Sequence, residues 1–212
     1  MKAVIFDLDG VICFTDKYHY EAWKTLADEI HVYFDTTINN RLRGVSRMES
    51  LNIILERAER EYSQEEKEVL AEKKNAIYVK LLDRMSPADL SDEVRTTLSE
   101  LRKRGYLLAI GSSSKNTKKI LSKLGLSDFF DAVSDGTNIS RSKPDPEVFL
   151  KAAEMLHVSL GEALVVEDAL AGIDAAVGGG FKSAGLGEAA AHPAVTFPMR
   201  TFSELLEILN GK

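Results

Sequence analysis

Short apolar runs alternate with helical patterns along most of this chain, and this alternation restricts the fold more than any other sequence feature. A short, continuous apolar run rich in β-branched residues is typical of a strand buried on both faces. Strands that alternate with helices predict right-handed crossovers and a doubly wound, Rossmann-like parallel α/β sheet. The apolar runs are Ala3–Phe6, Leu107–Ile110 and Ala163–Val166, with weaker ones at Phe129–Val133 and Ala194–Phe197. The helical patterns cover about 91–104, 114–124, 145–157 and 168–178.

Residues 15–86 interrupt this alternation, because they show helical spacing and no convincing strand. The segment from Glu56 to Lys74 is dense in charges, and we interpret it as a solvated helix face. We therefore predict an α/β catalytic core made of residues 1–14 and 87–212, with an inserted helical cap domain, or lid, at 15–86. The apolar residues at helical spacing are Leu51, Ile54, Leu55 and Ala58, and then Leu70, Ile77 and Leu81.

Composition excludes several classes of protein. The 212 residues carry 27 Lys+Arg against 33 Asp+Glu, a formal net charge of −6, with no basic block that would suit nucleic acid or an anionic membrane. Cys13 is the single cysteine, which rules out an internal disulfide or a cysteine zinc cluster. No apolar run approaches the ~18 residues of a membrane span, and the chain starts with a strand rather than a signal peptide. We expect a soluble, cytoplasmic protein that acts as a monomer.

The first and fourth apolar runs each end in a pair of acids. Asp7 and Asp9 follow the first run, and alternation along a strand directs them to the same side, while Gly10 allows the chain to turn. Glu167 and Asp168 follow the run at 163–166. Carboxylates at buried strand ends repel one another unless a cation or a proton compensates them, although each pair alone could also be solvent-exposed. An EF-hand does not fit, because its further ligands are missing at the required spacing.

Hydroxyl and ammonium groups follow the remaining strand ends. Ser112, Ser114, Lys115 and Asn116 lie where the second run meets a helix, a place suited to anions and equally to a simple helix cap. Lys143 precedes Pro144, which stiffens the chain there. Because doubly wound sheets bind ligands at the carboxyl ends of their strands, we expect these groups to gather around Mg²⁺ and a phosphoryl group.

These motifs, in this order, resemble those of the haloacid dehalogenase superfamily across the whole chain, and more closely its β-phosphoglucomutase family. The core motifs are Asp7-x-Asp9-Gly10, the strand end at Ser112, Lys143-Pro144 and Glu167-Asp168. The stretches that indicate the closer family are Lys2–Ile12, His19 with Ala22-Trp23, Gly44–Arg47, Ser86–Asp89 and Ser114–Asn116.

The resemblance implies a role for each core residue. Asp7 would be the nucleophile that forms an aspartyl-phosphate, and Asp9 the general acid/base. Asp7, the Asp9 backbone carbonyl, Glu167 and Asp168 would hold Mg²⁺. The reaction would interconvert β-D-glucose 1-phosphate and β-D-glucose 6-phosphate through a glucose 1,6-bisphosphate intermediate. Ser112 and Lys143 would bind the transferring phosphoryl group.

The inserted segment would supply the remaining contacts to the sugar phosphate. Thr15 would lie at the hinge, His19 near it, and Arg47 would bind the non-transferring phosphate with Ser114, Lys115 and Asn116. The residues assigned to substrate and phosphate binding are Thr15, His19, Trp23, Arg43, Gly44, Arg47, Ser112, Ser114, Lys115, Asn116 and Lys143.

The chain departs from the family pattern at three positions, and two alternatives stay open. Phe14 stands where an Asp usually precedes the hinge, Arg43 where Lys is usual, and Ala169 where some relatives have Ser. One alternative is a capped Mg²⁺-dependent phosphatase of small sugar phosphates, which differs only in whether water or a sugar hydroxyl accepts the phosphoryl group. The other is a signalling receiver module, which the long insertion and the second acidic pair disfavour.

Overall fold

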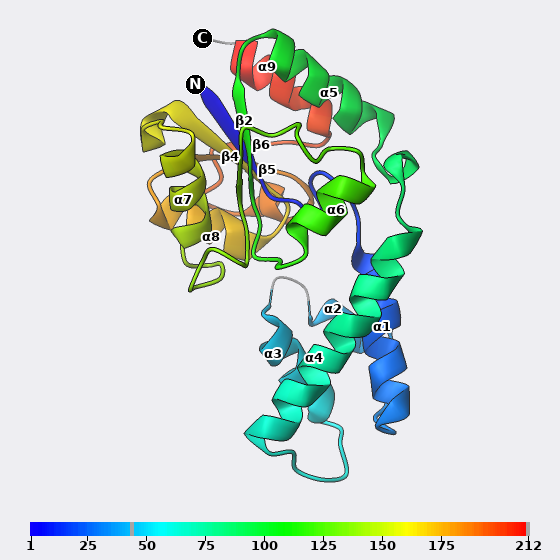
Figure 1. Ribbon diagram of the computed structural model, residues 1–212. Helices are drawn as coiled ribbons and strands as arrows, with labels where there is room; N and C mark the ends of the chain where they lie inside the picture. The colour runs from blue at the N-terminus through cyan, green and yellow to red at the C-terminus, as the bar shows by residue number, and fades with distance from the viewer. Residues whose placement is uncertain (43–44, 211–212) are drawn as a thin grey trace. The chain divides into compact units, whose positions relative to one another are not determined.

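The computed structural model describes residues 1–42 and 45–210, and it divides into two compact units (Figure 1). One unit, here called the core unit, comprises Met1–Phe14 and Ser86–Lys212; the other, the cap unit, comprises Thr15–Met85. The sequence placed residue 86 with the insertion, but Ser86 lies in the core unit, where its backbone N–H donates to Asp89 Oδ2 at 2.9 Å. No helix in the described parts of the chain is long and apolar enough to cross a membrane.

The core unit contains a parallel sheet in the order β3-β2-β1-β4-β5-β6, which confirms the doubly wound α/β class. The first strand pairs with the second on one side and the fourth on the other, so that Phe6 lies opposite both Ile110 and Val166. The chain changes direction across the sheet between the first and fourth strands, which is where such folds bind ligands. The strands are β1 (Ala3–Phe6), β2 (Leu107–Gly111), β3 (Ala132–Ser134), β4 (Ala163–Glu167), β5 (Lys182–Gly185) and β6 (Phe197–Pro198).

Helices cover both faces of this sheet (Figure 1). Ala3 and Ile5 of β1 belong to an apolar cluster with Phe149 of α7 and Ala176 of α8, and all four are fully buried. Phe6 of β1 points to the opposite face, because successive strand residues alternate. The core helices are α5 (Asp92–Lys103), α6 (Thr117–Lys123), α7 (Glu147–Met155), α8 (Leu170–Gly178) and α9 (Leu205–Asn210). Short 3₁₀ turns lie at Pro87–Asp89, Leu160–Glu162, Gly187–Ala191 and Phe202–Glu204.

The sequence did not predict β5, and the expected bounds of two weaker strands differ from those in the structure. β5 has the sequence Lys-Ser-Ala-Gly, whose last three residues are buried but too small to give an apolar signal. The strand expected at 129–133 starts at Ala132, because Phe129 and Phe130 pack edge-to-face at a centroid distance of 5.3 Å instead of pairing with β2. Of the run at 194–197 only its last residue lies in β6, since the N–H of Ala194 donates to the His192 ring at 3.1 Å.

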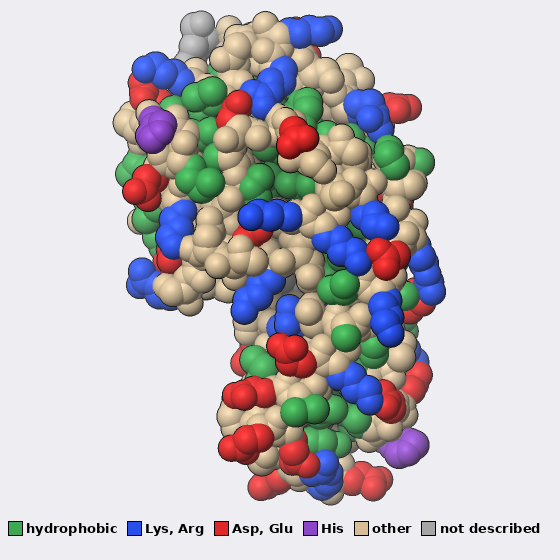
Figure 2. Space-filling view, viewed as in Figure 1, with side chains coloured by type: hydrophobic (Ala, Val, Ile, Leu, Met, Phe, Trp, Pro, Cys, Tyr) green, Lys and Arg blue, Asp and Glu red, His purple; other side chains and the backbone are tan. Residues whose placement is uncertain are grey.

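The described residues of the cap unit form helices joined by turns and contain no strand, as the spacing predicted. Its helices are α1 (Asp16–Glu29), α2 (Thr36–Asn40), α3 (Arg47–Leu55) and α4 (Gln64–Leu81), followed by a 3₁₀ turn at Leu82–Arg84. A capping box at Ser63 and Glu66 begins α4. On the face shown in Figure 2, acidic and basic side chains of this unit are interspersed. Some charged residues of the unit form ion pairs, such as Arg60 with Glu66 at 2.9 Å.

The solvated-face interpretation of the charged segment is wrong at one residue. The buried stripe of α4 consists of Ala71, Lys74, Tyr78 and Leu81, at helical spacing. Lys74, at the end of the charge-dense segment, is only 3% exposed. A helix buries whichever face its neighbours cover, and the sequence alone does not reveal that a lysine belongs to that face.

Candidate active site

The acids predicted at the ends of two strands lie close together at the carboxyl end of the sheet. The N–H of Asp7 donates to the carbonyl of Val166 at 2.9 Å, which sets the end of β1 beside the end of β4. Carboxylate oxygens of Asp7, Glu167 and Asp168 all lie within 4.8 Å of one another. Asp9 is partly buried nearby, and its charge helps to raise the pKa of Asp168. Side chains from separate strands thus form one acidic cluster, here taken as Asp7, Glu167 and Asp168.

Two glycines make room for these carboxylates. Gly10 has a φ of +89°, and a Cβ built there would overlap the carboxylate of Asp168. Gly172 lies in the first turns of α8, where a Cβ would overlap the carboxylate of Glu167. Glu167 Oε2 also accepts the N–H groups of Asp168 and Ala169 at 2.9 and 3.0 Å, which fixes its side chain. Both glycines are therefore required by close packing against an acid.

Lys143 lies between two members of the cluster. Its ammonium donates to Asp7 Oδ1 and to Glu167 Oε1, the latter at 2.5 Å, and its side chain is 10% exposed. The same ammonium lies 4.7 Å from the ring centre of Phe149. Gly111 leaves space for that ring, because a Cβ there would approach Phe149 Cδ1 to 2.7 Å. Lys143 is thus held beside Asp7 by charge and by packing.

The cluster carries more negative than positive charge. Burial raises the pKa of Asp7 well above its usual range, despite the opposing charge of Lys143. Burial and the Glu167 charge raise the pKa of Asp168 to about 7. Burial alone would lower the pKa of Lys143, but the charges of Asp7 and Glu167 raise it above its ordinary value. The three carboxylates therefore favour binding a proton or a cation, and their oxygens suit a divalent ion.

The segment after β2 forms a serine-rich turn. The Ser112 hydroxyl, 3% exposed, accepts the N–H of Ser114 at 3.2 Å, and the Ser114 hydroxyl accepts the N–H of Asn116 at 3.1 Å. Lys115 is exposed. The helix expected from residue 114 begins only at Thr117, because these hydroxyls bind the backbone N–H groups of the turn.

The cap unit gathers several of the residues predicted to bind substrate around a buried lysine. Lys74 Nζ lies 2.8 Å from His19 Nδ1 and 4.6 Å from the ring centre of Trp23. The His19 ring stacks on Tyr78 at 4.0 Å, and the Tyr78 hydroxyl donates to Thr15 Oγ1 at 3.1 Å. An ammonium can only donate, so His19 Nδ1 accepts and the ring is neutral. Thr15, His19 and Trp23 therefore belong to one contact network within this unit.

Arg47 also contributes to this environment. It is partly buried at the start of α3, which Ser46 caps by accepting the N–H of Glu49 at 3.2 Å. Burial lowers the pKa of His19 well below its usual value, and the charges of Lys74 and Arg47 lower it further. Arg43 and Gly44, also predicted to bind substrate, lie outside the described residues.

The sequence motifs did not indicate Lys74, Tyr78 or Phe149 as residues of the site. Lys74 and Tyr78 are four residues apart, so one helix face carries both, and that spacing was the available signal. Phe149 follows the Lys143 motif by six positions in an ordinary amphipathic helix, and no sequence feature distinguishes it from a core residue.

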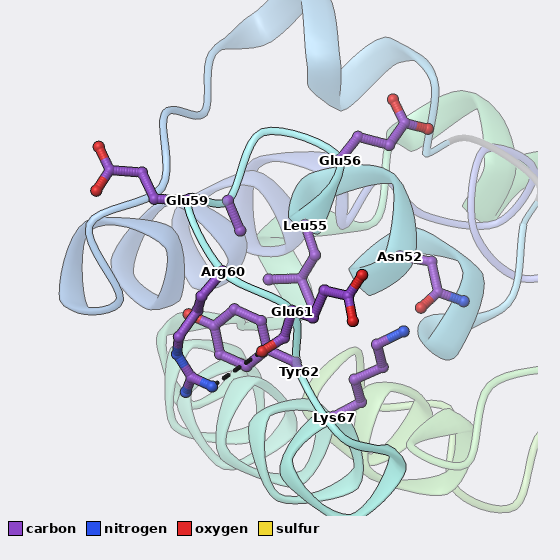
Figure 3. Close-up of a pocket in the computed structure, with 9 residues that line it drawn as sticks. Asn52, Leu55, Glu56, Glu59, Arg60, Glu61, Tyr62 and Lys67 are labelled. Atoms are coloured by element: carbon purple, nitrogen blue, oxygen red, sulfur yellow. Dashed lines mark hydrogen bonds between the residues drawn. The ribbon is translucent and has the colours of Figure 1, made fainter.

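A separate cavity of about 610 Å³ lies in the cap unit, around the segment that joins α3 to α4 (Figure 3). Arg60 is fixed there by Glu66 at 2.9 Å, by the carbonyl of Glu61 at 3.1 Å and by stacking 3.8 Å from the Tyr62 ring centre. None of the described residues predicted for the site lines this cavity, so we assign it no part in the chemistry. Its lining residues are Asn52, Leu55, Glu56, Ala58, Glu59, Arg60, Glu61, Tyr62 and Lys67.

Comparisons with known proteins agree with the motif order. The family model of the haloacid dehalogenase-like hydrolases matches residues 1–180. The chain is 42% identical to the β-phosphoglucomutase of Bacillus subtilis strain 168 over 213 residues, which cover 99% of this chain and 94% of that protein. It is 32% identical to the phosphorylated carbohydrates phosphatase of Thermotoga maritima over 189 residues, or 88% and 82% of the two proteins. The crystal structure of β-phosphoglucomutase from Clostridium difficile matches with a TM-score of 0.89 and 38% identity, covering 99% of this chain and 96% of that one.

The role of Gly172 gives a first testable prediction. Gly172→Ala should displace the Glu167 carboxylate and weaken divalent-cation binding by roughly 10- to 100-fold, the usual cost of disturbing a ligand's support. Gly178→Ala in the same helix is the matched control, because a Cβ there meets nothing within 4 Å. Calorimetric titration with Mg²⁺ measures both variants. Equal affinities would show that Glu167 does not hold the ion.

The neutral His19 gives a second prediction. Unfolded His19 takes up a proton near pH 6.5, whereas the folded residue, with its lowered pKa, does not until a lower pH. Below about pH 6.5 the unfolded state therefore binds more protons, and the free energy of unfolding of the cap unit should fall by up to ~1.4 kcal/mol per pH unit. His19→Gln should remove this part of the pH dependence.

Trp23, the single tryptophan, lies buried in the cap unit and reports its unfolding by fluorescence. Urea titrations at pH 7.5 and 5.5 would compare the wild type with His19→Gln, and with His31→Asn at an exposed position as the control. An unchanged pH dependence in His19→Gln would contradict the prediction.

Proposed function

The chain belongs to the haloacid dehalogenase-like hydrolases, and from this premise we propose that it is an isomerase of the β-phosphoglucomutase type. It interconverts β-D-glucose 1-phosphate and β-D-glucose 6-phosphate through an aspartyl-phosphate and glucose 1,6-bisphosphate. The observation that carries this proposal is the pairing of Asp7 with Lys143 at the end of β1, with Asp9 two residues further along. The 42% identity to the Bacillus subtilis mutase over nearly the whole chain supports the choice of substrate.

Asp7 is the nucleophile in this proposal. Phosphorylated Asp7 gives its phosphoryl group to the free hydroxyl of a sugar monophosphate, and the bisphosphate so formed returns its other phosphoryl group to Asp7. Lys143 suits this step because its ammonium, already beside Asp7, can meet the negative oxygens of the transferring group. Ser112, buried at the end of β2, supplies a hydroxyl for the same group.

Asp9 is the general acid/base. In the first transfer it removes the proton from the attacking sugar hydroxyl. In the second transfer a phosphoryl group passes from the bisphosphate to Asp7, and Asp9 returns a proton to the sugar oxygen that this group leaves. Asp9 suits this role because it lies two residues after the nucleophile, just beyond the end of β1, and is less deeply buried than Asp7.

The acidic cluster fits Mg²⁺, because it offers an all-oxygen donor set with an excess of negative charge. We assign the ion to the carboxylates of Asp7, Glu167 and Asp168 and to the backbone carbonyl of Asp9. When bound, Mg²⁺ supplies positive charge that offsets the phosphoryl oxygens.

The cap unit supplies the cations for the rest of the substrate. Arg47 is assigned to the non-transferring phosphate, together with Ser114, Lys115 and Asn116 of the core unit. Thr15, His19 and Trp23 are assigned to substrate binding and hinge support, and Lys74 joins them through its contact with His19. Roles for Arg43 and Gly44 stay predictions, as do monomeric action and a cytoplasmic location.

A sugar-phosphate phosphatase is the alternative, supported by the 32% identity to the Thermotoga maritima enzyme. The mutase is favoured by the higher identity and by the basic environment around Arg47 and Lys74, since a mutase must bind two phosphates. Both activities share the core residues, so the accepting group decides between them.

Phosphorus NMR tests the proposal directly. The enzyme, Mg²⁺ and β-glucose 1-phosphate are mixed with a catalytic amount of glucose 1,6-bisphosphate. Accumulation of glucose 6-phosphate supports the mutase, whereas release of inorganic phosphate at a comparable rate would replace it with the phosphatase.

A third prediction concerns the nucleophile. Asp7→Asn should reduce turnover by at least ~1000-fold, because the cluster has no second nucleophile. Glu167 is the other carboxylate that contacts the Lys143 ammonium, and it is assigned to the metal. Asp128→Asn, an exposed acid of the core unit, is the control and should keep wild-type turnover. Substantial residual activity in Asp7→Asn would remove Asp7 from this role.

A fourth prediction separates the two phosphate sites. Arg47→Ala should lose roughly 2–5 kcal/mol of binding, as a charge pair does when one member is removed. This corresponds to about 30-fold to several-thousand-fold in mutase kcat/KM. Phosphorylation of Asp7 by acetyl phosphate, which has no second phosphate, should stay unchanged.

Arg57→Ala, at an exposed position of the cap unit, is the matched control for both assays. Equal losses in the two assays would mean that Arg47 has a structural role. No loss in either would favour the phosphatase.

A further inference from the structure

Lys143 lies on a connection that lacks regular structure. The segment from Asp135 to Pro146 joins β3 to α7, and it contains turns and bends but no strand or helix. By contrast, Asp7 directly follows β1 and donates its N–H to the Val166 carbonyl, and Glu167 is the last residue of β4, paired with Gly185 of β5. The position of the Lys143 ammonium between the two acids therefore depends on how this connection is anchored.

Glu147, the first residue of α7, provides an anchor. Its Oε2 accepts the Ser140 N–H at 3.0 Å, the Ser140 hydroxyl at 2.8 Å and the Arg141 N–H at 2.8 Å, and its Oε1 accepts the Ser140 N–H at 3.1 Å. These bonds reach back to the connection, two and three residues before Lys143, rather than to the first turn of α7. Hydrogen bonds to Ser140, together with those to Arg141 and Lys151, lower the pKa of Glu147 to about 2, so it stays ionised.

The helix that carries Glu147 is packed firmly on the sheet. Val148 and Phe149, the next two residues of α7, are fully buried against the sheet. Lys151, one turn later, lies 3.2 Å from Glu147 Oε1 and also donates to the carbonyl of Asn138. The Glu147 side chain is 15% exposed, while its partners Ser140 and Arg141 lie at the surface. Together these contacts attach residues 138–141 to a helix that is packed on the sheet.

We propose that Glu147 is a positioning residue for phosphoryl transfer: its carboxylate holds residues 138–141 against α7 and thereby fixes the Lys143 ammonium between Asp7 and Glu167. The inference rests on the proposed function, because it assigns Lys143 to the transferring phosphoryl group. Glu147 touches neither substrate nor reacting atoms. Its effect passes through the two residues that separate Arg141 from the lysine.

A carboxylate at the first position of a helix has an ordinary alternative role. It can stabilise the helix through its charge near the N-terminus, whether or not its oxygens contact Ser140 and Arg141. Two substitutions separate the roles. Glu147→Asp keeps the charge but withdraws the oxygens by one methylene from Ser140 and Arg141. Glu147→Gln loses the charge but keeps a carbonyl oxygen at the original reach.

The positioning role therefore predicts that Glu147→Asp is the more damaged variant. We expect its kcat for β-glucose 1-phosphate to fall roughly 10- to 100-fold, the cost of a misplaced catalytic group, with KM changed much less. Glu147→Gln should stay within about threefold of the wild type, because its carbonyl oxygen can replace Oε2 and accept from Ser140 and Arg141, although its amide nitrogen cannot accept as Oε1 does. Glu154→Asp and Glu154→Gln, at an exposed site on the same helix, are the matched controls.

Two readouts do not depend on the sugar substrate. The first is the affinity of the Mg²⁺-loaded protein for inorganic phosphate, measured by calorimetry. The second is the ¹⁵Nζ signal of the Lys143 ammonium in lysine-labelled protein, assigned with Lys143→Met; such a signal is observed when the ammonium is held in hydrogen bonds. Both should weaken in Glu147→Asp and persist in Glu147→Gln. Thermal melts show whether each variant is folded at the assay temperature.

The proposal is overturned if Glu147→Asp retains the wild-type kcat, phosphate affinity and Lys143 signal. It is also overturned if Glu147→Asp retains as much as Glu147→Gln or more, since the charge and not the reach would then matter. If the wild type fails to convert β-glucose 1-phosphate, the proposed function fails. The phosphate affinity and the Lys143 signal then still decide the role of Glu147.

Discussion

The Lys143 ammonium between the Asp7 and Glu167 carboxylates is the interaction on which the rest of the core unit depends. Two acids at the ends of neighbouring buried strands can lie side by side only where a cation or a proton compensates their charge. The sheet order places the acids together, and Gly10 and Gly172 leave room for their partners. The remaining negative charge makes the cluster compatible with a divalent cation. An ammonium held beside carboxylates is the arrangement that the proposed phosphoryl transfer uses.

The groups of this cluster differ in how firmly the fold holds them. Asp7 is held by its N–H bond to the Val166 carbonyl at the end of β1, and Glu167 by its place in β4 beside Gly185 of β5. Lys143 has no strand or helix around it and depends on side-chain contacts from α7, namely those of Glu147 and the Phe149 ring. In our proposal, the carboxylate of Glu147 therefore helps to keep the Lys143 ammonium beside the nucleophile.

The cap unit has its own buried lysine, in different surroundings. Lys74 contacts the neutral His19 and lies over the rings of Trp23 and Tyr78, which attract its charge through their electron-rich faces. Arg47 adds further positive charge, strong enough to affect the pKa of His19. Positive side chains of the cap unit thus lie close to a neutral histidine.

The sequence by itself determined the parallel α/β class, the helical insertion and the acids at the two strand ends, because buried strands and amphipathic helices have distinct apolar periods. It did not reveal β5, whose residues are small, or the burial of Lys74 within a charged segment. It also gave no sign of the contacts of Glu147 and Phe149, which lie within an ordinary helical pattern. Those features depend on the tertiary structure, because the role of a charged or aromatic side chain depends on which distant residues the fold brings within a few ångströms. Local spacing in the sequence does not identify those distant residues.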